Sequence, residues 1–234
     1  MIERIQSALA GIDLEPAARE TMERYVALFL ERNAAMNLSS ARDAEAVAGH
    51  VRDSLSIAPF VSTPLVDIGS GGGFPALPLV IATGCRATLI ESTGKKARFL
   101  LETVRALDLP VDVRAERAED AAHDSLLRGR FASATARAVA SVPVVLELTV
   151  PFLEVGGLAV LQRGRIDARE RVAAADAALV LGARIEDEVA LDPSSDGERR
   201  VLLVRKTAPT SARFPRRAGI PAKRPLCYDE TRGA

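Results

Sequence analysis

The chain has 234 residues, 48% of them hydrophobic, and a formal net charge of zero, so it can bury a sizeable core and lacks the overall basic charge typical of nucleic-acid-binding proteins. The two cysteines, Cys85 and Cys227, predict neither a disulfide framework nor a metal site. The N-terminus carries Glu3 and Arg4 and does not look like a signal peptide, and no apolar run approaches the roughly 20 residues that span a bilayer. We therefore expect a cytoplasmic protein with no membrane or metal partner.

The first 60 residues predict a helical extension in front of the main domain. Apolar residues recur at helical spacing over 2–12, a second helix over 16–33 opens with a proline, and a third is predicted over 44–58. His50 and Asp53 stand three positions apart on the third helix, where their side chains can meet. We expect them to pack or to form a hydrogen bond rather than to act in catalysis.

A glycine cluster organises the rest of the chain. The apolar run 65–68 predicts a short strand, residues 69–73 hold four glycines, and the apolar segment 76–83 has the length of a helix. Strand, glycine turn and helix form the first unit of a nucleotide-binding α/β sheet, because glycine permits the sharp turn and the helix amides point at the ligand.

The spacing of the glycines indicates which ligand this loop binds. A dinucleotide fingerprint needs a third glycine where this chain has Phe74. The pattern Asp67-x-Gly69-x-Gly71-x-Gly73 instead resembles the first motif of S-adenosylmethionine (SAM) methyltransferases. Glu91 ends the next predicted strand, 86–91, about 20 residues past the loop, where an acid can accept hydrogen bonds from ribose hydroxyls. Both features favour an adenosine-type cofactor, although a glycine turn without a ligand and a solvated carboxylate remain open.

Strands and helices alternate through the rest of the domain, which predicts a parallel sheet with helices on both faces. Strands are expected over 111–115, 131–137, 158–162, 183–189 and 201–205, with Gly156 and Gly157 ending a mostly helical segment over 142–153; the other helices are expected over 95–107, within 116–127 and over 167–181. The short turn-rich stretch 192–197 predicts a hairpin and hence an antiparallel last strand. We therefore expect a Rossmann-like α/β fold of the class I SAM-dependent methyltransferase type, with a seven-stranded, mostly parallel sheet.

The C-terminal segment has a composition of its own. From Val201 to Tyr228 there is no acidic residue, and its prolines prevent a long helix. Such a local positive field suits contacts with phosphates, although a solvated tail would have the same composition. We expect the RNA-contacting residues of this segment to be Arg213, Arg216, Arg217, Lys223 and Arg224. The predicted division is thus an extension over 1–60, a SAM-binding domain over 61–207 and a basic tail over 208–234.

Several stretches together resemble the RsmG family, also called GidB, of bacterial methyltransferases that act on small-subunit ribosomal RNA. The matching stretches are Ala35-Met-Asn-Leu-Ser39, His50-Val-Arg-Asp-Ser54, Val66-Asp-Ile-Gly-Ser-Gly-Gly-Gly-Phe-Pro75, Glu91-Ser-Thr-Gly-Lys-Lys96, Phe99-Leu100, Arg117-Ala-Glu-Asp120, Ala136-Arg-Ala-Val-Ala140 and Phe214-Pro-Arg-Arg-Ala-Gly-Ile-Pro-Ala-Lys-Arg-Pro225. They occur in the family's order. The resemblance implies methyl transfer from SAM to N7 of a guanine in the 530 loop of 16S rRNA, with the rRNA or the small ribosomal subunit as partner, and we expect a monomer.

The resemblance also implies the site residues. Cofactor contacts fall on Asp67, Gly69, Gly71, Phe74, Glu91, Ser92, Thr93, Ala118, Glu119 and Arg137. Ala118 and Glu119 take the adenine side, and Arg137 is the expected catalytic residue, at the strand end where methyl transfer would occur; a structural ion pair is the alternative for it. This chain has Gln162-Arg163-Gly164 where the family usually has Lys-Gly, so we assign Arg163 no lysine-specific role.

Three other functions remain open. A SAM enzyme acting on a small molecule would have no use for the basic tail. A SAM-fold module that holds nucleotide or RNA without chemistry is disfavoured by the complete glycine motif. A nicotinamide oxidoreductase is disfavoured by Phe74. The chain also lacks the Asp-Pro-Pro-Tyr and Asn-Pro-Pro-Tyr motifs of amino-group methylation.

Overall fold

The computed structural model describes residues 1–137, 140–191 and 199–226; the predicted turn at 192–197, Cys227 and two residues of the matching stretch at 136–140 lie outside these ranges. The helices are α1 (Ile2–Leu9), α2 (Pro16–Met36), α3 (Ala44–Leu55), α4 (Ala76–Thr83), α5 (Gly94–Leu107), α6 (Ala118–Ala121), α7 (Val142–Thr149), α8 (Ala168–Val180) and α9 (Ile220–Lys223), with 3-10 turns η1 (Ala58–Phe60) and η2 (Val150–Phe152). The strands are β1 (Leu65–Ile68), β2 (Ala87–Ile90), β3 (Val111–Arg114), β4 (Phe131–Arg137), β5 (Leu153–Arg163), β6 (Ala183–Ala190) and β7 (Arg200–Lys206).

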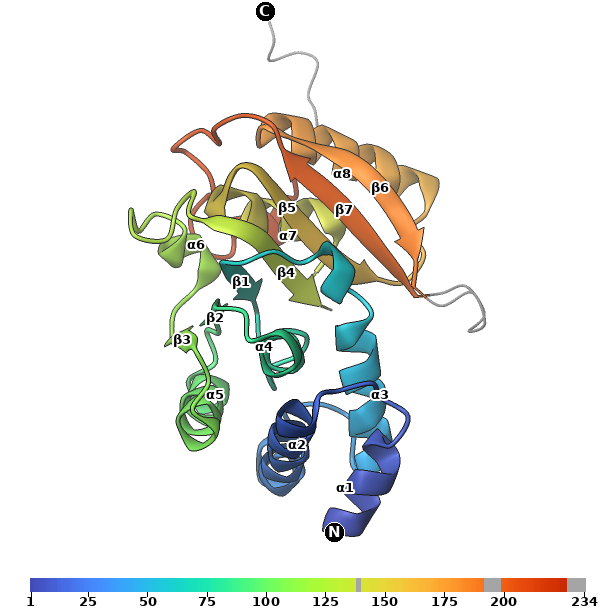
Figure 1. Ribbon diagram of the computed structural model, residues 1–234. Coiled ribbons are helices and arrows are strands. Elements are labelled where there is room, and N and C mark those ends of the chain that lie inside the picture. The colour runs from blue at the N-terminus through green and yellow to red at the C-terminus, as the bar shows by residue number, and fades with distance from the viewer. Residues whose placement is uncertain (138–139, 192–198, 227–234) are drawn as a thin grey trace, which may run out of the picture.

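The strands form one twisted sheet in the order β3-β2-β1-β4-β5-β7-β6, and Figure 1 shows its β5, β7 and β6 part from the face. The first five strands are parallel, and β1 lies between β2 and β4. The last strand in the chain, β7, runs antiparallel to both β5 and β6 and lies between them. The predicted fold class is confirmed: the protein has a seven-stranded, mostly parallel sheet with an antiparallel last strand, and a helical extension (α1–α3) precedes the sheet in sequence.

Alternating strand residues face two hydrophobic cores, one on each side of the sheet. The first core lies against α1–α5 and takes Leu65 and Val160 from the strands. The second lies against α6–α8 and takes Val66 and Leu161, each one residue further along the same strands. The carboxyl ends of β1, β2, β4 and β5 meet at one edge, and this edge is where a doubly wound sheet binds its ligand.

One predicted boundary was wrong. The expected strand over 158–162 begins earlier, at Leu153, and the preceding helix ends at Thr149. The two glycines that were expected to end a helix lie inside β5. Glycine is needed at both positions, because Gly156 has a positive φ of 94° and a Cβ on Gly157 would come within 3.0 Å of the carbonyl oxygen of Phe131. They allow an irregular pairing in which β5 gains residues relative to β4.

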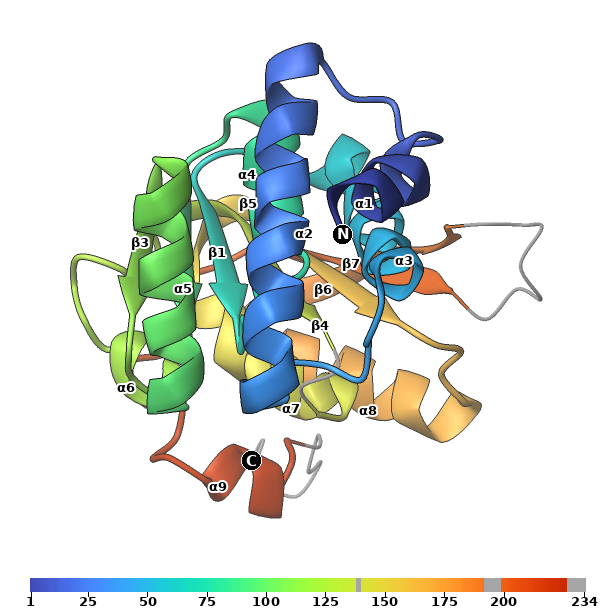
Figure 2. The same ribbon diagram turned by 90° about the horizontal axis from the view of Figure 1, so that it is seen from below.

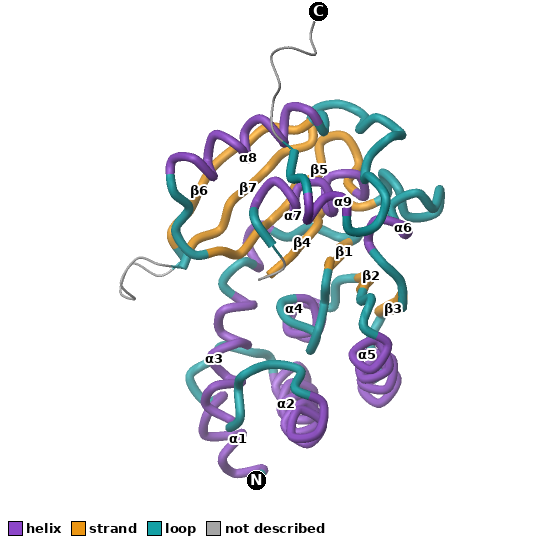
Figure 3. The backbone as a smooth tube through the Cα atoms, turned by 180° about the vertical axis from the view of Figure 1, so that it is seen from behind, coloured by secondary structure: helices purple, strands orange, loops and turns teal. Residues whose placement is uncertain are grey.

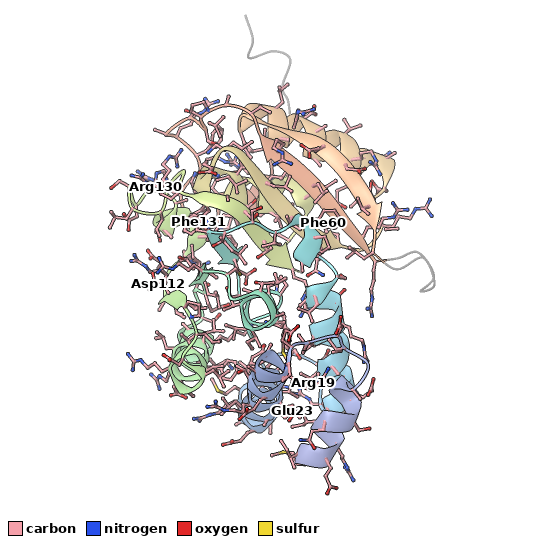
Figure 4. The ribbon with its side chains drawn as sticks, in the orientation of Figure 1. Arg19, Glu23, Phe60, Asp112, Arg130 and Phe131 are labelled. Carbon is pink, nitrogen blue, oxygen red and sulfur yellow. The ribbon has the colours of Figure 1, made fainter. Side chains whose placement is uncertain are left out.

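The N-terminal extension shares the first core with the sheet. In Figure 2, α2 runs alongside α4 and α5, and residues from all three helices are buried in that core. Arg19, labelled in Figure 4, donates hydrogen bonds to the carbonyl oxygens of Leu9 (3.0 Å) and Ile12 (2.6 Å) and so ties α2 to the end of α1. Among the described residues, no helix combines the length and apolarity needed to cross a membrane.

The described part of the C-terminal segment packs against the protein rather than standing free in solvent. It runs past α6 and α7 and forms the short helix α9, as Figure 3 shows from behind. Phe214 is only 3% exposed and belongs to the second core. A freely solvated tail is therefore excluded for residues 208–226.

Candidate functional site

The loop after β1 takes the conformation that its glycines permit. Gly69, Gly71 and Gly73 all have positive φ angles, of 70°, 56° and 97°. Residues with a Cβ rarely adopt this region, so the three positions of the motif need glycine for their backbone shape. The loop leads directly into α4 at the carboxyl edge of the sheet.

Helix α2 holds this loop from the side of the N-terminal extension. The hydroxyl of Tyr25 donates a hydrogen bond to the carbonyl oxygen of Gly72 (2.8 Å). A Cβ on Gly72 would come 2.5 Å from Cε2 of Phe29, so the fourth glycine of the cluster lets α2 approach the loop. Phe74 packs edge-on against Phe29, with ring centroids 5.2 Å apart. The predicted cofactor residue Phe74 is therefore also a packing residue, only 6% exposed.

Asp67 lies on β1 beneath the loop and is 1% exposed. Its Oδ1 accepts a hydrogen bond from the hydroxyl of Thr135 (2.7 Å), whereas its buried Oδ2 has no partner. Burial raises the pKa of Asp67 to about 7, although the Thr135 hydrogen bond and the charge of Arg137 oppose the shift. The site thus contains a carboxyl group that titrates near neutral pH.

Glu91 joins the glycine loop to the segment that follows β2. Its Oε2 accepts a hydrogen bond from the backbone N–H of Gly71 (2.9 Å) and its Oε1 accepts one from that of Thr93 (2.7 Å). Ser92 and Thr93 are exposed beside it, while Glu91 itself is 5% exposed. Each carboxylate oxygen keeps a lone pair, so ribose hydroxyls can still donate to Glu91.

A cleft of about 710 Å³ opens at the carboxyl edge, in front of the glycine loop. The predicted residues Gly69, Gly71, Phe74 and Arg137 line it. Arg137, at the end of β4, donates from Nη1 to Oδ2 of Asp53 (3.1 Å) and lies over the ring of Phe74, 5.2 Å from its centroid. The residue expected to be catalytic is thus both exposed to the cleft and ion-paired.

Helix α3 forms one wall of the cleft. Asp53 accepts from Arg137, and its backbone carbonyl oxygen accepts a hydrogen bond from Nε2 of Gln162 on β5 (2.6 Å). His50 packs on Phe74 at 5.3 Å, and burial lowers its pKa with help from the charge of Arg137. The pair has the packing and bonding roles expected from sequence, but Asp53 bonds to Arg137 on another element.

The cleft is basic. Among its described lining residues Asp53 is the only acid, and the basic residues are Lys96, Arg137, Arg163, Arg199 and Arg200. Two hydrogen bonds fix the position of Arg163: its guanidinium donates to the carbonyl oxygen of Ala140 (2.9 Å) and to Oε1 of Glu170 (3.1 Å). This charge suits a ligand that brings phosphate groups to the edge of the sheet.

The other predicted residues lie outside the cleft. Ala118 and Glu119 are buried on α6, further along the same edge, and Oε1 of Glu119 accepts a hydrogen bond from the backbone N–H of Gly219 (2.9 Å). Of the predicted RNA-contacting residues, four are exposed: Arg213, Arg217, Lys223 and Arg224. Arg216 is half-buried and pairs with Glu147 (2.5 Å).

Reasoning from the sequence missed part of this site. Lys96 was noted only as part of a stretch that matches the family, and Arg199 and Arg200 not at all, because the three come from α5, from the segment before β7 and from β7, which are far apart in sequence. The role of Tyr25 and Phe29 was also missed, since helical periodicity marks them only as buried. Among the described residues there is no group of three or more His, Cys, Asp and Glu side chains that could hold a metal ion.

Comparison with known proteins identifies the family of this chain. The family model described as "rRNA small subunit methyltransferase G" (GidB) matches residues 18–195. A protein of Chloroflexus aggregans named ribosomal RNA small subunit methyltransferase G is 40% identical over 224 residues, 92% of this chain and 93% of its own length. Its namesake in Rubrobacter xylanophilus is also 40% identical, over 227 residues that cover 92% of this chain and 87% of that protein.

Among solved structures, an O-methyltransferase from Bacillus cereus in complex with SAH is similar, with a TM-score of 0.58 and 16% identity over 88% of this chain and all of the other. At that identity the likeness concerns the fold alone. The family match covers most of the chain and includes the glycine loop, Glu91, Glu119 and Arg137. The chain therefore belongs to the rRNA small subunit methyltransferase G (GidB) family.

Proposed function

We propose that this protein transfers a methyl group from SAM to N7 of a guanine in the 530 loop of 16S rRNA. The observation that carries the proposal is the convergence of the glycine loop, Glu91 and Arg137 at one edge of the sheet, beside a basic cleft, in a chain of this family. Membership of the family supports the choice of substrate, since the named relatives are methyltransferases of small-subunit rRNA.

The residues at the edge fit the cofactor. Gly69 is exposed and Gly71 half-buried, and a Cβ on Gly71 would have only the carbonyl oxygen of Gly69 within 4 Å, at 3.7 Å, so this part of the loop is open to a ligand. Glu91 keeps lone pairs for ribose hydroxyls. The glycine loop and Glu91 would hold SAM, with Ala118 and Glu119 on its adenine side, and SAM would supply an electrophilic methyl group.

The chemistry needs no general base. N7 of guanine has a lone pair and no proton to remove, so the main task of the protein is to hold the base and the methyl donor in line. Arg137 is fixed for this task by Asp53 and by the ring of Phe74. Methyl transfer moves the positive charge from the sulfonium of SAM to the base, so the net charge in the cleft stays the same and no further anion has to be supplied.

We propose that RNA contacts two basic surfaces. One is the mouth of the cleft with Lys96, Arg199 and Arg200, and the other is the exposed set Arg213, Arg217, Lys223 and Arg224. Arg216 is not included in this set, because its guanidinium already binds Glu147. We further propose that the enzyme acts as a monomer in the cytoplasm.

The direct test uses small ribosomal subunits from cells that lack this gene. The subunits are incubated with the protein and methyl-labelled SAM, and 7-methylguanine is mapped by chemical strand cleavage. We expect one cleavage site, in the 530 loop. Label that never enters RNA, although SAM binds, would support a small-molecule methyltransferase instead.

The cofactor site has its own test. Gly71→Asp places a side chain in a loop whose φ of 56° favours glycine, and Glu91→Ala removes the proposed acceptor of the ribose hydroxyls, so each should weaken SAM binding by about tenfold or more. Glu102→Ala, at an exposed carboxylate on α5, is the matched control and should bind SAM normally. Unchanged affinity in both site variants would rule out the assignment.

The RNA surface on the C-terminal segment is tested by salt dependence. Changing the exposed set Arg213, Arg217, Lys223 and Arg224 to glutamine should weaken RNA binding and flatten the dependence of its affinity on salt. A control with the same loss of charge changes four exposed arginines elsewhere, Arg4, Arg32, Arg98 and Arg105. Equal salt slopes for the two variants would remove these four residues from the RNA surface.

A further inference from the structure

The C-terminal strap, defined here as residues 208–226, is fixed to the protein along its length. Its start is held where the hydroxyl of Thr210 donates to the carbonyl oxygen of Leu181 (2.7 Å). Its middle is held by Phe214, buried in the second core, and by Arg128, whose guanidinium donates to the carbonyl oxygens of Thr210, Ser211 and Phe214 at 2.8–3.0 Å. A segment used only as a flexible RNA-binding tail does not need these contacts.

An ion pair between Arg216 and Glu147 also attaches the strap. Glu147 lies on α7 and is fully buried, so its charge must be compensated inside the protein. Arg216 compensates it through its backbone N–H (2.8 Å) and two guanidinium nitrogens, Nε at 2.9 Å and Nη2 at 2.5 Å. Nη2 also donates to the carbonyl oxygen of Arg224 (2.7 Å), which closes the strap back on itself around α9.

The strap also forms a hydrogen bond with helix α6, which carries the predicted adenine-side residues. This helix has four residues, a single turn that is not stable without neighbours. The strap contacts this helix at Glu119, which accepts a hydrogen bond from the N–H of Gly219 (2.9 Å). It also contacts the residues just after the helix, where the carbonyl oxygen of Pro215 lies 2.9 Å from Nε2 of His123. Figure 3 shows α6, α7 and α9 close together on this side of the sheet.

We propose that the strap sets the adenine side of the cofactor site, with Arg216 as a positioning residue that acts through Gly219 on Glu119. The proposal rests on the proposed function, in which Ala118 and Glu119 contact the adenine. The ion pair with Glu147 holds Arg216 in place, and Arg216 in turn holds the turn before α9 through its hydrogen bond to Arg224. Gly219, in that turn, donates the hydrogen bond to Glu119 on α6. The basic composition of the strap therefore has a structural cause at Arg216, separate from any contact with RNA.

Two variants test this inference without removing the strap. Arg216→Lys keeps a positive charge beside Glu147 but loses the planar, two-pronged donor. Gly219→Ala strains a backbone with φ of 80° and so shifts the N–H that binds Glu119. Gly84→Ala is the matched control, because Gly84 also has a positive φ, of 69°, also has nothing within 4 Å of an added Cβ, and lies at the far end of α4 from the glycine loop.

The readouts are the Kd and KM for SAM, kcat at saturating SAM, RNA affinity and the melting temperature. In Arg216→Lys and Gly219→Ala we expect the Kd and KM for SAM to rise about threefold to tenfold, the factor expected for one lost hydrogen bond, with kcat and RNA affinity unchanged. Gly84→Ala should lower the melting temperature as Gly219→Ala does and leave the Kd for SAM at the wild-type value.

The inference is overturned if both strap variants bind SAM like the wild type, or if Gly84→Ala raises the Kd as much as they do. Weakened RNA binding with unchanged SAM affinity would assign the strap to RNA alone. A wild-type protein that binds no SAM would overturn the proposed function together with this inference, so the two failures are distinguishable.

Discussion

Replacing Asp67 by asparagine should change how stability depends on pH. The pKa of Asp67 is raised from 3.8 to about 7, so the native state holds a proton that the unfolded chain has already lost at pH 5 or 6. The free energy of unfolding therefore falls as pH rises through this window, by about 1.4 kcal/mol per pH unit. Over the full shift of about three units this amounts to roughly 4 kcal/mol, and above pH 7 the contribution is level.

The amide introduced by Asp67→Asn cannot ionise, but its oxygen can still accept the hydrogen bond from Thr135. The other titrating groups are the same in both proteins and cancel in the difference. We expect the variant to gain stability relative to the wild type as pH rises from 5 to 7. Guanidinium unfolding followed by circular dichroism at pH steps across this range measures the difference directly.

A second variant checks the cause of the shift. Thr135→Val removes the hydrogen bond that favours the charged carboxylate, so it should raise the pKa of Asp67 further and extend the loss of stability beyond pH 7. A stability difference between Asp67→Asn and wild type that stays flat from pH 5 to 8 would refute the reasoning, because it would mean that Asp67 is ionised throughout.

Three more changes test the contacts around the cleft. Gly72→Ala should cost about 1–3 kcal/mol of stability, since its Cβ would overlap the ring of Phe29, and Phe29→Leu should recover part of the loss in chemical unfolding. Tyr25→Phe removes one hydrogen bond to the loop and should cost about 0.5–1.5 kcal/mol in the same measurement; no loss would mean that water replaces the bond. Asp53→Asn should lower the rate of methyl transfer at saturating SAM about tenfold or more by releasing Arg137, and a wild-type rate in single-turnover assays would contradict that role.

Local sequence signals were sufficient for most of the sheet. The helix over 76–83 ends where it was expected, because its apolar run is bounded by Pro75 and Gly84. The strand over 131–137 also has the expected bounds, since small residues alternate there between charged residues at both ends. The predicted β5 was too short, since two glycines inside a strand look like its boundary. They belong to an irregular pairing with β4, which only the partner strand determines.

Contacts between distant segments were beyond prediction from the sequence. Nothing in the spacing of Asp53 and Arg137 shows that α3 and β4 meet at the cleft. The strap was predicted to be a basic tail because its composition is rich in arginine and lysine. Composition does not show that one of these arginines, Arg216, pairs with a buried glutamate. The glycine loop, in contrast, could be recognised, since its backbone shape depends on residues that are adjacent in the chain.

The position of β7 has a consequence for synthesis of the protein on the ribosome. In the described part of the chain β6 pairs only with β7, which follows it in sequence and separates it from β5. Until residues up to Lys206 have been made, β6 has no strand to pair with and the free edge of β5 is open to other chains. Arg199 and Arg200 join the cleft only when β7 inserts, so a growing chain cannot complete the basic lining of the cleft before β7 has emerged.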